Sequence, residues 1–135
     1  MIDDNFEIKI PEVNSESGLR LCCGNRKIYI KSLRLFVTNI PATLAKMRAL
    51  TENDLKNYST SVHSVKGMCV YIGAEEAATK AKQLENMADA GDFKGVFEQN
   101  EIFIGQIEKI TGSVQTWLNG NSAYLEKLEA GRVYG

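Results

Sequence analysis

Apolar side chains recur every three or four residues over most of the chain, which is the period of an amphipathic helix. The first long pattern of this kind places six apolar residues on one stripe: Tyr29, Leu33, Phe36, Ile40, Leu44 and Met47. Glycines divide this pattern from those that follow, at Gly73 and at the pair Gly91 and Asp92, where a helix can end or begin. The pattern predicts four main helices, over residues 26–49, 52–72, 75–90 and 92–118.

The connections between these four segments are short. Short connections force long amphipathic helices that follow one another to lie antiparallel. We therefore expect an all-α fold, an antiparallel up-down-up-down four-helix bundle with short flanking helices near residues 14–24 and 122–131. Alternating apolar residues over 6–10 favour some extended backbone before the first helix.

The segment over residues 52–72 has two distinct faces. Residues 51–54 resemble a capping box at its start. At about 100° per residue, its apolar side chains form one stripe: Leu55, Tyr58, Val62, Val65, Cys69 and Ile72. The single histidine, His63, lies on the opposite side, and the residues nearest to it on the helix are mostly polar, small or basic: Lys56, Ser59, Thr60, Lys66, Gly67 and Val70. We therefore expect His63 to be exposed to solvent and unpaired.

Length and composition fit one domain over residues 1–135. A chain of 135 residues that is 44% hydrophobic can bury about two-thirds of its unfolded surface in one core. The net charge of −1 comes from interspersed signs, so we expect no nucleic-acid partner and no membrane association. The amino terminus lacks a signal-peptide pattern, and no apolar run approaches the ~18 residues that span a bilayer. A cytoplasmic protein is the resulting expectation.

The cysteines give little support for a metal site or a thiol enzyme. Cys22 and Cys23 are adjacent, and Cys69 lies on a predicted buried stripe, so we expect reduced thiols. A zinc or iron site needs three or four convergent ligands, and we expect none here. A cysteine nucleophile would need a histidine base, and His63 is predicted to face away from Cys69.

One short motif is more specific. His63, Lys66 and Gly67 form the pattern HxxKG, which Gly73 and Ala74 follow within the same helical register. This pattern resembles the signature of histidine-containing phosphotransfer (HPt) domains of bacterial phosphorelays. The resemblance covers residues 14–118, because several further features are similar to the family: Tyr29 to Phe36, Pro41, Leu84 with Glu85, and Gly91 with Asp92.

The sequence departs from the family pattern at three positions of the same segment. Val62 and Cys69 replace smaller residues on the predicted buried stripe, where they should alter packing only. Met68 also replaces a smaller residue and lies at the border of that stripe.

The resemblance implies a covalent phosphoryl carrier that is not an independent enzyme. His63 would accept the group from the aspartyl phosphate of a response-regulator receiver domain and pass it to another receiver. Lys66 would offset the phosphoryl charge, and Gly67 would let the partner backbone come close. Receivers or a hybrid histidine kinase would be the partners of a monomeric chain, docking on a patch that comprises Ser59, Thr60, Ser64, Val70 and Tyr71.

The residue types agree with this chemistry. A neutral, exposed imidazole is nucleophilic at physiological pH and needs no separate base. The sequence has no acidic cluster around His63, so Mg²⁺ and its aspartate ligands are expected on the receiver, with no cofactor on this chain. It also has no glycine-rich nucleotide loop, so we expect no autophosphorylation from ATP.

Two other classes of function stay open at this point. The first is a non-catalytic helical-bundle interaction module, which would dock a receiver or histidine kinase through the same face without carrying phosphate. The second is an enzyme that acts on a small molecule. The sequence shows no convergent acid and base residues for it, although a deep polar pocket would favour it.

Overall fold

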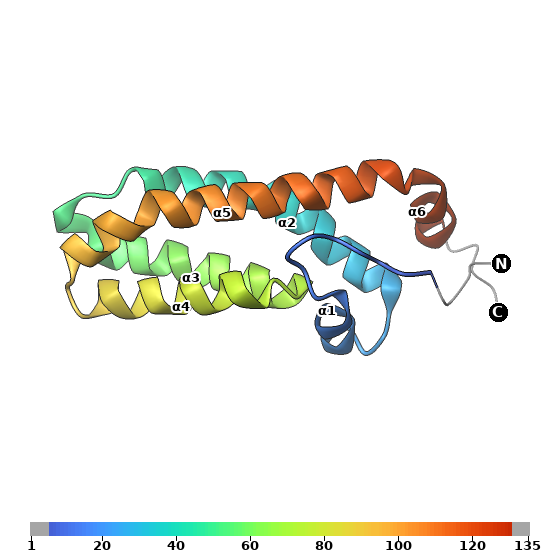
Figure 1. The fold of residues 1–135 in the computed structure, drawn as a ribbon, viewed down its shortest axis with the longest axis horizontal. Coiled ribbons are helices and arrows are strands. Elements are labelled where there is room, and N and C mark those ends of the chain that lie inside the picture. The colour runs from blue at the N-terminus through green and yellow to red at the C-terminus, as the bar shows by residue number, and fades with distance from the viewer. Residues whose placement is uncertain (1–5, 131–135) are drawn as a thin grey trace.

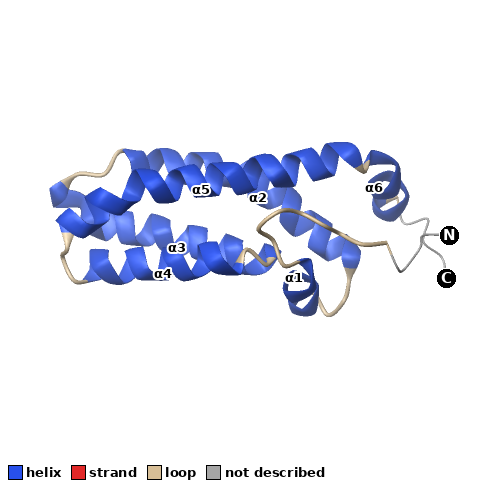
Figure 2. Ribbon diagram, in the orientation of Figure 1, coloured by secondary structure: helices blue, strands red, loops and turns tan. Residues whose placement is uncertain are grey.

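The computed structural model describes residues 6–130, which are mostly helical (Figure 2). Its elements, in order, are α1 (Ser15–Leu21), α2 (Arg26–Arg48), the 3₁₀ turn η1 (Glu52–Asp54), α3 (Leu55–Ile72), α4 (Glu75–Asp89), α5 (Phe93–Gly120) and α6 (Ser122–Glu129). Extended pairing within the described range is limited to one isolated bridge between Ile10 and Val13. The prediction of an all-α fold is confirmed, and the bounds of the long helices lie close to the predicted ones.

Four long helices lie side by side along the long axis of the molecule (Figure 1). Helix α3 packs between α2 and α4, and α5 packs against both α2 and α4. The short α1 contacts α3 and α2, whereas α6 contacts α2 and α5. None of the helices within residues 6–130 is both long and apolar enough to cross a membrane.

The core comprises the predicted apolar stripes, except that Leu55 at the start of α3 is only half-buried. All six stripe residues of α2 are buried, and so are Val62, Val65 and Cys69 of α3. Among the aromatic residues of α5, Phe97 is 65% exposed. Phe97 lies one residue after the buried Val96, and about 100° of rotation carries it off the stripe. It packs instead against Phe93, with ring centroids 5.8 Å apart.

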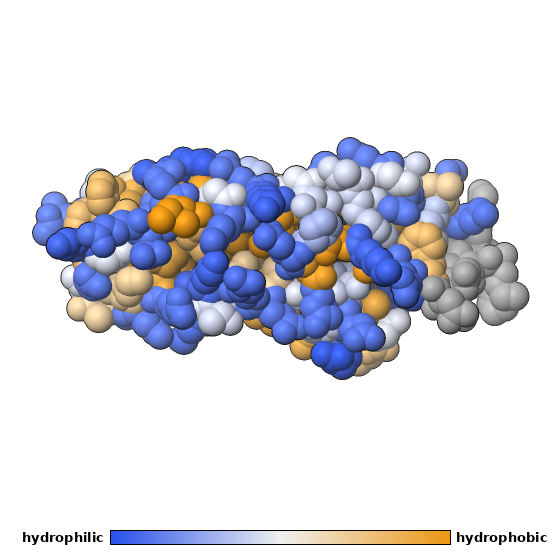
Figure 3. Space-filling model, in the orientation of Figure 1, coloured by the Kyte–Doolittle hydropathy of each residue, from blue (hydrophilic) through white to orange (hydrophobic). Residues whose placement is uncertain are grey.

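Two large apolar side chains of α5, Phe97 and Ile102, are exposed outside its buried stripe. Ile102, on the same helix, is 61% exposed. Figure 3 shows apolar side chains interrupting a mostly hydrophilic surface over this side of the bundle. About 140° around the helix axis separates Phe97 from Ile102, so the two side chains flank the buried stripe of α5 on different sides.

Side chains and glycines define most helix ends. The carboxylate of Asp92 accepts a hydrogen bond from the Gly95 amide at 2.9 Å and so caps α5, as predicted. The capping box predicted over residues 51–54 is wrong. Neither Thr51 nor Asp54 makes a side-chain capping bond, because the 3₁₀ turn delays the start of α3 to Leu55. Asp54 accepts a hydrogen bond from the Asn57 side-chain amide instead, at 2.6 Å.

The segment before α1 packs across one end of the bundle. Ile8 and Ile10 are buried, and the hydroxyl of Ser15 donates to the carbonyl of Ile8 at 2.6 Å. The ring of Phe6 stacks on Tyr124 of α6, with centroids 4.0 Å apart, and meets the edge of Trp117 of α5 at 6.4 Å. These contacts join the first described residues to the last two helices.

Gly73 ends α3 in a left-handed conformation, with φ of 89°. A Cβ atom at this position would overlap the carbonyl oxygen of Asn14, because the residue before α1 passes directly against the end of α3. Only glycine both adopts the left-handed conformation readily and has no Cβ to overlap Asn14. This contact packs α1 against the end of the bundle.

Replacing Gly73 with alanine is expected to lower the free energy of unfolding by about 3 kcal/mol, through backbone strain and displacement of Asn14. Gly91 is the matched control, because its φ is 76° but nothing lies within 4 Å of the position that an added Cβ would take. Gly91→Ala should cost about 1 kcal/mol, from strain alone. Urea unfolding followed by circular dichroism measures both values, and equal losses would contradict the steric account.

Candidate functional site

His63 lies in the middle of α3, on the face that does not enter the core. The neighbouring Val62 and Val65 are fully buried, and helix geometry then turns the imidazole outward. The His63 side chain is 64% exposed, which agrees with the expected exposure. The expectation of an unpaired ring is wrong, since Nδ1 lies 2.6 Å from Oε2 of Glu85.

Glu85 belongs to α4, which packs alongside α3. Its position falls within the apolar stripe of that helix, so the residue is only 8% exposed. Three side chains surround its carboxylate. His63 contacts one oxygen, Oε2. Lys66 and Lys82 both donate to the other oxygen, Oε1, at 3.1 Å and 3.3 Å.

The surroundings of Glu85 act in opposite directions on its acidity. Burial raises the pKa of this carboxyl, but the hydrogen bonds from Lys66, His63 and Lys82 outweigh burial and hold the pKa below its ordinary value. Glu85 is therefore a carboxylate at neutral pH. An ionised carboxylate only accepts hydrogen bonds, so Nδ1 of His63 carries the hydrogen.

This assignment determines which ring nitrogen can react. In a neutral imidazole with hydrogen on Nδ1, the lone pair lies on Nε2. The bond to Glu85 is the only hydrogen bond of the His63 side chain within residues 6–130. Nε2 is therefore a nucleophile on the exposed part of the ring.

Lys66 and Gly67 lie one turn beyond His63 on α3. The side chain of Lys66 is only 24% exposed, because it reaches back to Glu85 rather than into solvent. Nothing lies within 4 Å of the position that a Cβ of Gly67 would take, so this glycine leaves open space beside the imidazole. Met68 is half-buried and packs against the core.

The five residues predicted to meet a partner all lie on α3, within about 100° of His63 around the helix axis: Ser59, Thr60, Ser64, Val70 and Tyr71. Val70 and Tyr71 are 43% and 59% exposed, so they present apolar surface about two turns beyond the imidazole. Ser59 is less available, because its hydroxyl donates to Asp89 of α4 at 2.6 Å. Val70 and Tyr71 are therefore on the part of the patch that is exposed, and Ser59 is on the part that borders α4.

Glu85 and Lys82 are the two residues of this cluster to which the sequence analysis gave no role. Glu85 did have a detectable signal, since it interrupts a stripe of small apolar residues that comprises Ala77, Ala81, Leu84 and Ala88. A carboxylate in such a stripe requires buried partners, and His63 and Lys66 supply them. Lys82 precedes Glu85 by one turn of α4 and gave no comparable signal.

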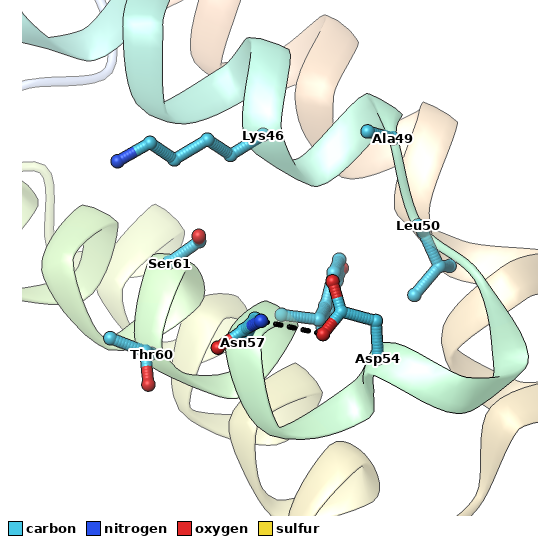
Figure 4. Close-up of a pocket in the computed structure, with 8 residues that line it drawn as sticks. Lys46, Ala49, Leu50, Asp54, Asn57, Thr60 and Ser61 are labelled. Carbon is cyan, nitrogen blue, oxygen red and sulfur yellow. Dashed lines mark hydrogen bonds between the residues drawn. The ribbon is translucent and has the colours of Figure 1, made fainter.

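A separate pocket of about 380 Å³ lies where α2 ends and α3 begins (Figure 4). Lys46, Asp54 and Tyr58 are its ionisable lining residues, and His63 does not line it. Asp54 bonds the Asn57 amide, and the Tyr58 hydroxyl donates to the buried Asn100 at 2.8 Å. The Asp54 carboxylate is bonded within the pocket wall, the Tyr58 hydroxyl is directed to the core, and Lys46 forms no ion pair or hydrogen bond with either, so the pocket gives no support for a small-molecule enzyme.

Cys69 does not provide a second nucleophile. Its side chain is fully buried between α3 and the core, and burial raises the pKa of the thiol to about 12. Cys22 is also buried, whereas Cys23 is exposed and has a left-handed backbone, with φ of 53°.

Comparison with known proteins agrees with the geometry. No curated protein and no solved structure matches the chain at a significant level. A family model for the Hpt domain matches residues 31–117, a range that contains His63, Lys66, Gly67 and Glu85. This range is more than half of the 135 residues, and the chain therefore belongs to the Hpt domain family.

Proposed function

We propose that His63 accepts a phosphoryl group from the aspartyl phosphate of one receiver domain and passes it to another. Membership in the Hpt family implies histidine phosphotransfer within a phosphorelay, by a carrier without independent catalytic activity. The observation that carries the finer proposal is the His63 ring itself. Nδ1 is held by a buried carboxylate on α4, and Nε2 is left exposed to an incoming partner.

In the proposed step, the Nε2 lone pair of His63 attacks the phosphorus atom of the receiver's acyl phosphate. The bond from Nε2 to phosphorus forms as the bond from phosphorus to the aspartate oxygen breaks, and the aspartate leaves as a carboxylate. The ring becomes cationic while Nδ1 keeps its hydrogen. Glu85 lies 2.6 Å from Nδ1 and stabilises this cation. Transfer to the second receiver reverses these bond changes.

The other site residues have supporting roles in this proposal. Lys66 places an ammonium group beside the reacting ring, where it offsets phosphoryl charge. The open space at Gly67 admits the receiver backbone, and Val70 and Tyr71 add apolar contact. The receiver supplies Mg²⁺ and its acidic ligands. The proposal includes an up-down-up-down bundle and a single, monomeric domain in the cytoplasm.

The test of this function is transfer of labelled phosphate to the purified chain from receiver domains charged with acetyl phosphate. Profiling against the receivers of the same organism identifies the cognate partners by their rates. Receivers that bind the chain without any labelling would replace the carrier function with that of a docking module.

Replacing Glu85 with glutamine is expected to slow phosphoryl transfer from a saturating receiver by about 10- to 100-fold. A glutamine oxygen can still accept the Nδ1 hydrogen bond, but it brings no negative charge to stabilise the cationic ring. Single-turnover labelling of His63 measures the rate. Glu76→Gln is the matched control on α4, because Glu76 is exposed and its one ion pair within residues 6–130 is with Lys80. Equal rates for the two variants would reject a role for Glu85.

A further inference from the structure

Two ammonium groups share a single oxygen atom at the site. Lys66 from α3 and Lys82 from α4 both donate to Oε1 of Glu85, at 3.1 Å and 3.3 Å. Their like charges repel one another across this oxygen, while Oε2 is occupied by His63. The carboxylate therefore holds one more cation than its single charge can neutralise.

The net charge of the cluster suits an incoming anion. One carboxylate and two ammonium groups around a neutral imidazole leave one net positive charge. Phosphoryl transfer to His63 adds one unit of negative charge, because a PO₃ group enters and the aspartate carboxylate leaves with the receiver. Phosphorylation therefore brings the net charge of the cluster to zero. If the cluster contained only one lysine, phosphorylation would leave it with a net negative charge.

The two lysines differ in their freedom to move. The side chain of Lys66 is 24% exposed, whereas that of Lys82 is 55% exposed and makes the longer of the two bonds. Lys82 is also on α4, whereas Lys66 is on α3 with His63. Of the two, Lys82 can leave Glu85 with less disturbance of packed side chains.

We propose that Lys82 is a second phosphoryl-binding residue, which moves from Glu85 to the phosphoryl oxygens once His63 is modified and favours retention of the group on this chain. This inference rests on the proposed function of His63. The movement relieves the repulsion between the two ammonium groups, and Lys66 stays on Glu85. No bond to phosphorus is made or broken by Lys82.

The test is the equilibrium distribution of phosphoryl groups between this chain and one receiver, measured by separating the two labelled proteins. A change in docking alters the rates of forward and reverse phosphoryl transfer by the same factor. The final ratio therefore reports only the relative stability of the two phosphorylated proteins. Lys82→Gln is expected to shift the ratio toward the receiver by about two- to fivefold. Lys82→Arg should keep the wild-type ratio, and the shift should shrink in high salt.

The matched control is Lys80→Gln, which removes the same charge from α4 at a lysine whose one ion pair among the described residues is with Glu76. A lysine that merely anchors Glu85 before transfer would give a shift of opposite sign, since its loss would destabilise the unphosphorylated chain. An unchanged ratio or a shift toward His63 overturns the proposal. Failure of the wild-type chain to accept label would instead reject the proposed function, and that result precedes any comparison of variants.

Discussion

The His63→Gln variant is expected to take up no phosphoryl group from a receiver charged with acetyl phosphate. The substitution removes the only imidazole of the chain, and an amide nitrogen has no available lone pair with which to attack phosphorus. The wild-type label should be labile in acid and stable in alkali, as expected of a phosphoramidate. Autoradiography of the separated proteins after exposure to each condition measures both properties.

Loss of labelling must be distinguished from loss of folding. The His63 ring is 64% exposed and makes one hydrogen bond within the described residues, so its removal should change the free energy of unfolding by about 1 kcal/mol or less. Thermal unfolding of the variant should therefore resemble that of the wild type. Equal labelling of the two proteins would place the phosphoryl group elsewhere and overturn the carrier function of His63.

Gly67→Gln is expected to make the protein more stable and yet a poorer phosphoryl acceptor. A glycine inside a helix costs about 0.5–1 kcal/mol relative to a good helix former, and no atom lies within 4 Å of the new Cβ. The added side chain fills the space beside His63 that the receiver backbone needs. Displacing the reacting atoms in this way should reduce the transfer rate by about 10- to 100-fold.

The matched control is Gly105→Gln in α5, because that helical glycine also has nothing within 4 Å of its Cβ position. Its stability should rise by a similar amount while its transfer rate stays at the wild-type value. Urea unfolding and single-turnover transfer are measured on both variants. A wild-type transfer rate for Gly67→Gln would show that the receiver does not approach α3 at this residue.

The faces of α3 could be predicted from the sequence because helix periodicity alone determines them. A residue such as Val62 or Cys69 is buried, and His63 is exposed, wherever the helix packs through its apolar stripe. Phe97 shows the limit of this reasoning. An apolar side chain alone does not indicate burial, because the rotation of Phe97 about α5 leaves it exposed.

The contact between His63 and Glu85 could not be predicted in the same way. The two residues are on different helices, so their meeting depends on how far α4 is shifted along α3. That shift follows from the turn at Gly73 and from the packing of small side chains, which periodicity does not specify. The start of α3 was missed for a related reason, because a 3₁₀ turn and a first helical turn have similar sequence preferences.

The aromatic cluster at the end of the bundle contains an intrinsic fluorescent probe. Trp117 is the sole tryptophan of the chain, and its indole lies against Phe6. Its emission should therefore follow detachment of the amino-terminal segment, whereas far-ultraviolet ellipticity follows loss of the long helices. Superimposable denaturation curves from the two signals would indicate one cooperative unit, and an earlier fluorescence change would reveal fraying that starts at this end.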